Sequence, residues 1–189
     1  MSQVIVIESL SLDGVIQDPD GNQGFRQGGW ALRYGSEPVT GDPFALGEVL
    51  DTGALLLGRR IWEMFARIWP GRDDPFSAKM NAVPKLVASR SLVQAAEWQN
   101  STVLQGDLAA AVRERKRAQD IMVMGSGSVV RTLMAHDLVD EYRLLVFPLV
   151  LGEGMRLFPD GTAPVNLALA SAQTTGPAVK LIYTRTENQ

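Results

Sequence analysis

The sequence contains no cysteine and only one histidine, and these two absences exclude several kinds of chemistry. Without cysteine the chain can form neither a disulfide nor a Cys-ligated zinc site, and it has no thiol nucleophile. A lone histidine supports neither a multi-histidine metal site nor a Ser-His-Asp triad. We interpret His136 as a polar residue near a helix end, and we predict no metal site.

Long blocks of one charge and long apolar runs are also absent. The formal net charge is −3, and the only basic cluster, residues 113–117, is interpreted as the solvated face of a helix. No apolar run approaches the ~20 residues that span a bilayer. The N-terminus lacks the basic region and apolar core of a signal peptide. We therefore expect a cytoplasmic protein that binds neither nucleic acid nor membrane.

What the chain does contain is an ordinary globular composition. It has 189 residues, of which 46% are hydrophobic and 21% are charged. This length suits one domain with a substantial core, and no repeat or linker interrupts it. We predict a single domain over residues 1–189.

Short apolar runs alternate with helical patterns through the first two thirds of the chain. Such alternation predicts right-handed βαβ crossovers and a mainly parallel sheet. Asp42, Asp74 and Asp107 are placed to cap helices. The predicted strands are 4–9, 54–58, 85–89, 101–105 and 121–124, and the predicted helices are 42–53, 60–69, 74–83 and 107–117.

The last third has a different character. A long strand is predicted over 142–151, with a bulge or an edge at Pro148. Residues 167–175 and 179–186 flank Gly176-Pro177 and predict a hairpin. The predicted class is α/β, with a mixed, mainly parallel sheet flanked by helices and a C-terminal antiparallel hairpin. Residues 14–41 are polar and glycine-rich, which is typical of a functional or mobile loop.

Gly-Ser-Gly-Ser at 125–128 joins a buried strand to a helix. Glycine allows a close approach to a ligand, and a helix N-terminus favours an anion, so this turn suits a phosphate or pyrophosphate. A tight turn with a serine cap is an equal alternative on these residues alone. The stretch is neither the full dinucleotide fingerprint, since Val130 takes the place of the third glycine, nor a P-loop.

Two other junctions repeat this pattern. Gly58-Arg59 and Ser89-Arg90 follow two further predicted parallel strands, and open α/β sheets bind ligands at the carboxyl ends of their strands. Each arginine alone is typical of a surface charge. Together with 125–128, the set favours a ligand with several phosphates, such as a nucleotide.

Several of these segments resemble the dihydrofolate reductase-like superfamily. More closely, they are similar to stand-alone relatives of the reductase domain of bacterial bifunctional riboflavin-biosynthesis proteins, the RibD C-terminal domain. The matching segments are 11–14 (SLDG), Trp30 after glycines, 55–63, 87–91 and 124–154, and they cover most of the chain in order.

The resemblance implies a mixed eight-stranded sheet that binds NADPH across its strand ends. It places Asp13 near the reacting end of the cofactor, Trp30 on the wall of the substrate site, and a homodimer contact on the C-terminal strands. Asp13 and an ordered water are candidate proton donors, although an Asp-Gly turn also has a purely structural role. By motif, the resemblance assigns adenosine-side phosphates to Gly58 and Arg59, the 2′-phosphate to Ser89 and Arg90, and the pyrophosphate to Gly125, Ser126, Gly127, Ser128 and Val129.

The chain also departs from its relatives. Val15 replaces a common basic residue, Met124 replaces a common acid, and the zinc-binding deaminase domain is absent, which argues against a phosphoribosylaminouracil substrate. In dihydrofolate reductase the acid that binds the pterin lies in the first helix. Asp42 falls near that position in this sequence, with Glu48 one to two turns later, but Asp42 is already explained as a helix cap.

We therefore predict an NADPH-dependent oxidoreductase that reduces a small heterocyclic or carbonyl/imine compound. A riboflavin-pathway activity like that of 5-amino-6-(5-phosphoribosylamino)uracil reductase is one candidate. The alternative is a non-catalytic module that binds a nucleotide, flavin or drug. A Rossmann-type dehydrogenase is a second alternative, but it needs an acid where Ser89-Arg90 stands.

Overall fold

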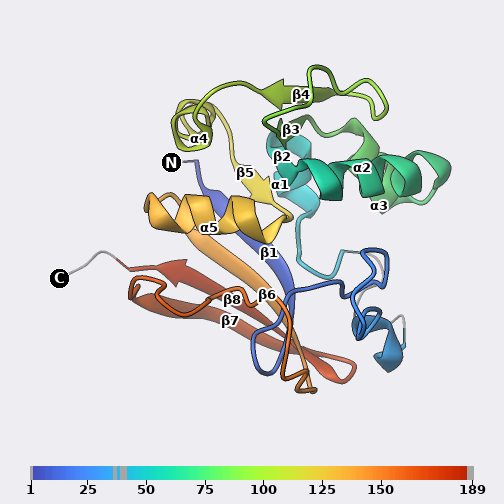
Figure 1. Ribbon diagram of the computed structural model, residues 1–189, viewed down its shortest axis with the longest axis vertical. Helices are drawn as coiled ribbons and strands as arrows, with labels where there is room; N and C mark the ends of the chain where they lie inside the picture. Colours follow the sequence, from blue (N-terminus) through green and yellow to red (C-terminus); the bar gives the residue numbers. More distant parts are fainter. Residues whose placement is uncertain (1, 36–37, 39–41, 187–189) are drawn as a thin grey trace. The chain divides into compact units, whose positions relative to one another are not determined.

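The computed structural model describes residues 2–35, 38 and 42–186. It divides into two compact units: unit 1 is Met1–Val6 with Leu46–Val139, and unit 2 is Ile7–Ala45 with Asp140–Gln189. Folding of the two units as one domain over 1–189 stays a prediction. Figure 1 shows the order of the elements. They are β1 (Val4–Ser11), η1 (Ala31–Tyr34), α1 (Gly47–Thr52), β2 (Ala54–Gly58), α2 (Arg59–Ile68), η3 (Trp69–Gly71), α3 (Pro75–Ala82), β3 (Lys85–Ala88), β4 (Ser101–Leu104), α4 (Leu108–Lys116), β5 (Ile121–Val123), α5 (Gly127–Ala135), β6 (Glu141–Phe147), β7 (Leu167–Thr175) and β8 (Ala178–Arg185).

The strands follow the hydrogen-bonded order β4-β3-β2-β5-β1-β6-β8-β7. The first five are parallel in the pairs β4-β3, β3-β2, β2-β5 and β5-β1, and β6-β8-β7 are antiparallel. This arrangement confirms the predicted mixed, mainly parallel sheet with a C-terminal antiparallel hairpin. It is the α/β architecture of the dihydrofolate reductase-like fold.

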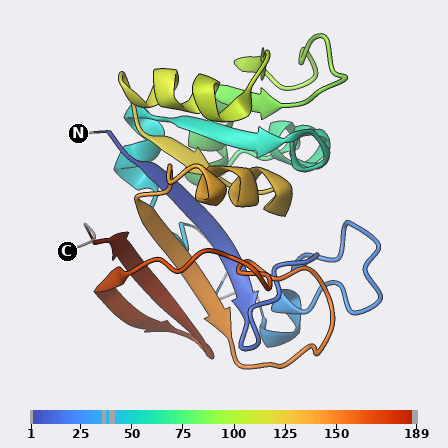
Figure 2. The same cartoon turned by 60° about the vertical axis from the view of Figure 1, so that its left-hand side comes forward.

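In unit 1 the central parallel strands β2 and β5 are apolar and buried because helices cover both faces of the sheet. β2 is buried along its whole length, as is β5. Helices α4 and α5 contact one another, as do α1 and α3, and Figures 1 and 2 show the two groups on opposite faces. The predicted strands at 54–58, 85–89, 101–105 and 121–124 are therefore confirmed to within a residue.

Two of the three predicted aspartate caps are confirmed. The Asp74 carboxylate accepts the amides of Phe76 and Ser77 at the start of α3, and Asp107 accepts the amide of Ala110 at the start of α4. Each cap satisfies amides that the first helical turn leaves without a partner. Pro75 at the first helical position adds to the signal at Asp74.

The predicted cap at Asp42 is wrong, because the helix there begins five residues later. α1 starts at Gly47, and Ala45 has a φ of 52°, which is incompatible with a right-handed helix. The Arg143 guanidinium donates to the carbonyl oxygens of Phe44 and Ala45, which fixes this segment in a turn. Glu48 lies in the first turn of α1.

Unit 2 is built on the antiparallel strands β6, β8 and β7, seen in Figure 2. β6 ends at Phe147, so the predicted strand 142–151 is too long. Pro148 has no amide hydrogen for a ladder, and Leu149 instead donates its amide to the Phe147 carbonyl. The predicted hairpin is confirmed, with Gly176 at a φ of 54° in its turn.

Candidate functional site

The ends of β2 and β5 approach one another closely in unit 1. The Gly58 amide donates to the Gly125 carbonyl at 3.0 Å. A Cβ on Gly58 would lie 3.0 Å from the Ser126 amide nitrogen and still closer to the Ser126 side chain. Only glycine leaves room for this approach. The structure therefore brings together Gly58 and 125–128, which the sequence analysis assigned to one ligand.

The turn at 125–128 opens α5 without a side-chain cap. Gly125 has a φ of 74°, and the peptide bond to Ser126 is cis. Ser126 occupies the N-cap position, but its hydroxyl caps no helix amide and lies 2.9 Å from the hydroxyl of Ser128. The predicted alternative of a serine cap is therefore wrong.

The first amides of α5 decide what the turn can hold. The Ser126 carbonyl accepts the amides of Val129 and Val130, at 2.9 and 3.2 Å. Val129 is buried, so it anchors the turn instead of offering its amide to a ligand. The amides of Gly127 and Ser128 precede these bonds and begin an uncapped helix of nine residues. Such a terminus attracts an anion through its amides and through the helix dipole.

Arg59 begins α2 and is already engaged within unit 1. Its Nε forms an ion pair with Glu63 at 2.6 Å, and its Nη1 donates to the Ser91 hydroxyl at 2.8 Å. Ser91 belongs to the segment that follows β3. Arg59 thus ties the end of β2 to the end of β3, and binding a phosphate would require it to share or leave the Glu63 carboxylate.

Ser89 and Arg90 differ in their surroundings. The Ser89 hydroxyl accepts the amides of Ser91 and Leu92, at 3.3 and 3.0 Å, so it shapes the turn after β3. Arg90 is exposed, and within the described part of the chain it has no hydrogen-bond or ion-pair partner. Of the two predicted phosphate-binding arginines, Arg90 is the one with a free guanidinium.

In unit 2, Asp13 is a structural carboxylate. Its Oδ1 accepts the Ser11 hydroxyl at 2.7 Å and the Leu151 amide at 3.1 Å, and its Oδ2 accepts the Gly152 amide at 2.8 Å. These bonds, led by that from Ser11, lower the pKa of Asp13 to about 2. An acid this strong is ionised at neutral pH and has no proton to give. These hydrogen bonds favour the ionised form of Asp13 and so argue against a proton donor, but its assignments as proton donor and as substrate contact both stay predictions.

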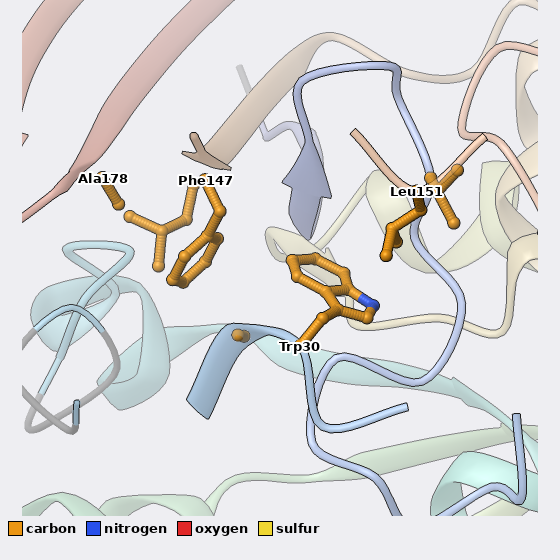
Figure 3. Packing of buried hydrophobic residues seen from close by; sticks show 7 residues of the cluster. Trp30, Phe147, Leu151 and Ala178 are labelled. Carbon is orange, nitrogen blue, oxygen red and sulfur yellow. The ribbon is translucent and has the colours of Figure 1, made fainter. Parts of the chain in front are cut away.

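Trp30 is a core residue of unit 2. Its side chain is fully buried, its Nε1 donates to the Gln17 carbonyl at 2.8 Å, and its ring meets Phe147 edge-on at 5.5 Å. Figure 3 shows it between Phe147 and Leu151. A residue without exposed surface cannot line an open pocket, so the predicted substrate-site role of Trp30 is wrong in this structure. Val15 is buried in the same cluster.

Comparison with known proteins identifies the family of this chain and its fold. The family model of the RibD C-terminal domain matches residues 2–181. The chain belongs to the RibD C-terminal domain family. It is 28% identical over 189 residues to the uncharacterised protein YyaP of Bacillus subtilis (strain 168), an alignment that covers 96% of this chain and 94% of YyaP.

Solved structures of low sequence identity share the RibD-like fold. A putative riboflavin biosynthesis protein from Shewanella sp. PV-4 superposes with a TM-score of 0.76 at 20% identity, covering 98% of this chain and 99% of that one. A pyrimidine reductase-like protein from Corynebacterium diphtheriae gives 0.66 at 13%, covering 99% and 93%. RibD of Acinetobacter baumannii gives 0.64 at 14%, and this chain covers 59% of its length.

One acidic residue in this RibD C-terminal domain was missed by sequence reasoning. Glu8 lies on β1, and its Oε1 is buried without a hydrogen-bond partner. The only available signal was an acid inside the apolar run 4–9, which was interpreted simply as a strand.

Among the described residues, neither a metal site nor a membrane helix adds to these candidates. In residues 2–35, 38 and 42–186, no three His, Cys, Asp or Glu side chains gather where they could hold a metal ion. The helices of the same residues are too short or too polar to cross a bilayer.

Proposed function

We propose that this chain is an NADPH-dependent reductase of a small heterocyclic or carbonyl/imine compound. The observation that carries the proposal is the uncapped start of α5, which Gly58 approaches closely. This arrangement suits the pyrophosphate of a dinucleotide, since it offers amide donors and a positive helix end without a bulky side chain. Family membership supports a reductase related to riboflavin biosynthesis, as do two structural neighbours, a putative riboflavin biosynthesis protein and a pyrimidine reductase-like protein.

The residues of unit 1 suit NADPH better than NADH. Arg90 offers a planar, permanently charged fork to a 2′-phosphate that carries close to two negative charges. Ser89 holds the turn from which Arg90 extends. The bound nucleotide would supply a hydride, and the protein would orient it and exclude water.

The residue at position 15 bears on the chemical class of the substrate. Val15, which stands where related reductases often carry a basic residue, is fully buried in the core of unit 2. It offers no charge to a substrate phosphate. We therefore propose a substrate that lacks the ribose phosphate of the riboflavin intermediate.

A non-catalytic binding module is the second candidate. The observation in its favour is Asp13, whose three hydrogen bonds leave it ionised and unable to donate a proton. Oxidation of NADPH with a panel of cyclic imines, aldehydes and reducible pyrimidines separates the two candidates. Tight NADPH binding without oxidation by any panel member would favour the binding module.

Cofactor titration tests the proposed nucleotide site directly. Gly127→Val should weaken NADPH binding at least as much as Ser126→Ala or Ser128→Ala, because a β-branched side chain blocks the approach to the start of α5. Fluorescence titration of NADPH measures this. Binding of NADPH to Gly127→Val with wild-type affinity would remove 125–128 from the site.

Arginine replacement tests the preference for NADPH. A charged hydrogen bond is worth roughly 1.5–3 kcal/mol, so NADPH should bind about ten- to a hundredfold more tightly than NADH. The preference should shrink as salt rises, because Arg90 is exposed. Arg90→Ala should cost NADPH much more affinity than NADH, whereas Arg59→Ala should weaken both, since the phosphates assigned to Arg59 are present in both cofactors.

The control is Arg115→Ala, which removes an exposed arginine from α4 in the same unit. Isothermal titration of both cofactors against each variant gives the comparison. Equal losses of NADPH and NADH affinity in Arg90→Ala would mean that Arg90 does not bind the 2′-phosphate.

A further inference from the structure

Glu63 lies one helical turn after Arg59 on α2, and the two side chains form an ion pair on the surface of unit 1. The Arg59 Nε and the Glu63 Oε1 are 2.6 Å apart. The pair is open to solvent, with 46% of the Arg59 side chain and 35% of the Glu63 side chain exposed, so a ligand can reach it. An acid beside a phosphate-binding arginine reduces the positive potential that the arginine offers to an anion. Glu63 therefore bears on which anions this site accepts.

The Arg59 guanidinium is held by one charged and one neutral partner. Its Nε bonds to the Glu63 carboxylate, and its Nη1 donates to the Ser91 hydroxyl at 2.8 Å. A guanidinium carries several further N–H donors, so a ligand phosphate can bind Arg59 while both of these bonds stay in place. Such binding puts two anionic groups, the phosphate and the Glu63 carboxylate, on one cation. The carboxylate then repels the ligand that the guanidinium attracts.

The other anion-binding groups of unit 1 have no such counter-charge among the described residues. Gly58, which precedes Arg59, approaches the start of α5, and no side chain caps that helix. β2 and β3 pair in parallel, so Arg59 and Arg90 follow neighbouring strand ends. Arg90 is exposed and has no partner in the part of the chain that the structure describes. The negative charge at the candidate site is thus placed at the group assigned to the phosphates that all adenine nucleotides share.

We propose that Glu63 is a specificity-determining residue of the nucleotide site, which disfavours ligands whose phosphate chain is highly charged. This inference rests on the proposed nucleotide-binding function. The pyrophosphate inside a dinucleotide carries about two negative charges, whereas the triphosphate of ATP carries about four, because it has one more phosphate and its terminal phosphate ionises twice. Repulsion by one fixed carboxylate grows in proportion to the charge of the ligand. Glu63 therefore penalises a nucleoside triphosphate more than a dinucleotide that has the same adenosine end.

Glu63→Gln isolates the effect of the charge. Glutamine keeps an oxygen that can accept the Arg59 Nε hydrogen, and the bond from Nη1 to Ser91 is untouched, so the guanidinium should keep its orientation. Affinity for NADH should rise about two- to threefold and affinity for magnesium-free ATP about four- to ninefold, since doubling an interaction energy squares the fold-change. NADPH should gain about as much as NADH, because its additional phosphate is assigned to Arg90. Fluorescence titration of NADH and NADPH, and displacement of NADH by ATP, measure these affinities.

Two control variants separate charge from other effects. Glu114→Gln makes the same exchange in an ion pair of the same length, with Arg117, at the end of α4 that leads toward the start of β5 and away from the strand ends. It should leave the ratio of ATP to NADH affinity unchanged. Glu63→Asp keeps the charge but shortens the side chain, so it should keep the wild-type ratio even though its bond to Arg59 is altered. The gains in Glu63→Gln should shrink as salt rises, because the pair is exposed.

The outcomes for Glu63 and for the nucleotide site are distinguishable. If wild type binds NADPH, then equal gains for NADH and ATP in Glu63→Gln would overturn the role of Glu63 alone. Unchanged or weaker binding of both ligands would do the same, as would a raised ATP to NADH ratio in Glu63→Asp. If wild type binds neither NADPH nor NADH, the proposed nucleotide site falls, and the role of Glu63 falls with it.

Discussion

Replacing Trp30 with phenylalanine tests whether this residue belongs to the core of unit 2. The substitution removes the Nε1 hydrogen from the Gln17 carbonyl and leaves a gap beside Phe147. A buried acceptor that loses its donor costs about 1–3 kcal/mol, and the smaller ring costs about 1–2 kcal/mol in packing. The free energy of unfolding should therefore fall by roughly 2–5 kcal/mol.

Trp69→Phe is a matched control. The Trp69 Nε1 is buried without a hydrogen-bond partner, so phenylalanine removes an unsatisfied donor while it keeps an aromatic ring near Phe65 and Phe76. Its loss should stay within about 1 kcal/mol, because the packing cost is offset by removal of the buried polar group. Urea unfolding followed by far-UV circular dichroism measures both variants. Equal, small losses would refute the core assignment, and unchanged stability with altered substrate turnover in Trp30→Phe would restore the pocket assignment.

Three further predictions concern Asp13, Glu8 and the edge strand β7. The pKa of Asp13 is lowered to about 2, so the ionised carboxylate stabilises the folded state above pH 3.8 and this contribution is lost as pH falls toward 2. Asp13→Asn should lower the free energy of unfolding at neutral pH by about 1–2 kcal/mol and flatten its decrease at acid pH, measured by urea titration. Burial raises the pKa of Glu8 to about 8, so the free energy of unfolding should decline as pH rises from 4.5 to 8. Glu8→Gln should abolish this decline, and a pH profile of the variant that runs parallel to that of wild type would contradict the prediction. The predicted homodimer should be disrupted by Leu169→Glu, which places a charge on the exposed outer strand β7. A monomer mass for wild type in light scattering at micromolar concentration would refute the dimer.

Helix starts and buried strands were predictable where their signals lie within a few neighbouring residues. Asp74-Pro75 and Asp107 mark helix starts because the capping side chain and the amides that it accepts lie within three residues. The buried parallel strands are continuous apolar runs for the same local reason, since both faces are covered. Asp42 carries an identical local signal and fails, because Arg143, far along the chain, holds the segment at Phe44 and Ala45 in a turn.

The candidate site was predictable only where its residues act through the backbone. Gly58 and 125–128 are conspicuous in the sequence, and their close approach follows from the pairing of neighbouring parallel strands. The burial of Trp30 and the hydrogen bonds of Asp13 were not predictable, because the environments of both residues come from distant segments. Phe147 and Leu151 bury the indole, and the amides of the 151–152 turn hold the carboxylate ionised. An aromatic or an acid in a polar loop gives no local indication of such contacts.

In the proposed nucleotide site, the two arginines at the strand ends have different roles. The Arg59 fork is shared between Glu63 and Ser91, so its charge is partly neutralised and its geometry is fixed before a ligand arrives. Arg90 is exposed and has no partner among the described residues, so its binding capacity remains available, at the cost of ordering a long side chain. Arg59 is therefore suited to the phosphates that both nucleotides carry, and Arg90 to distinguish nucleotides by an additional phosphate. This division explains why loss of Arg59 should weaken both cofactors, while loss of Arg90 should weaken chiefly the one that carries the 2′-phosphate.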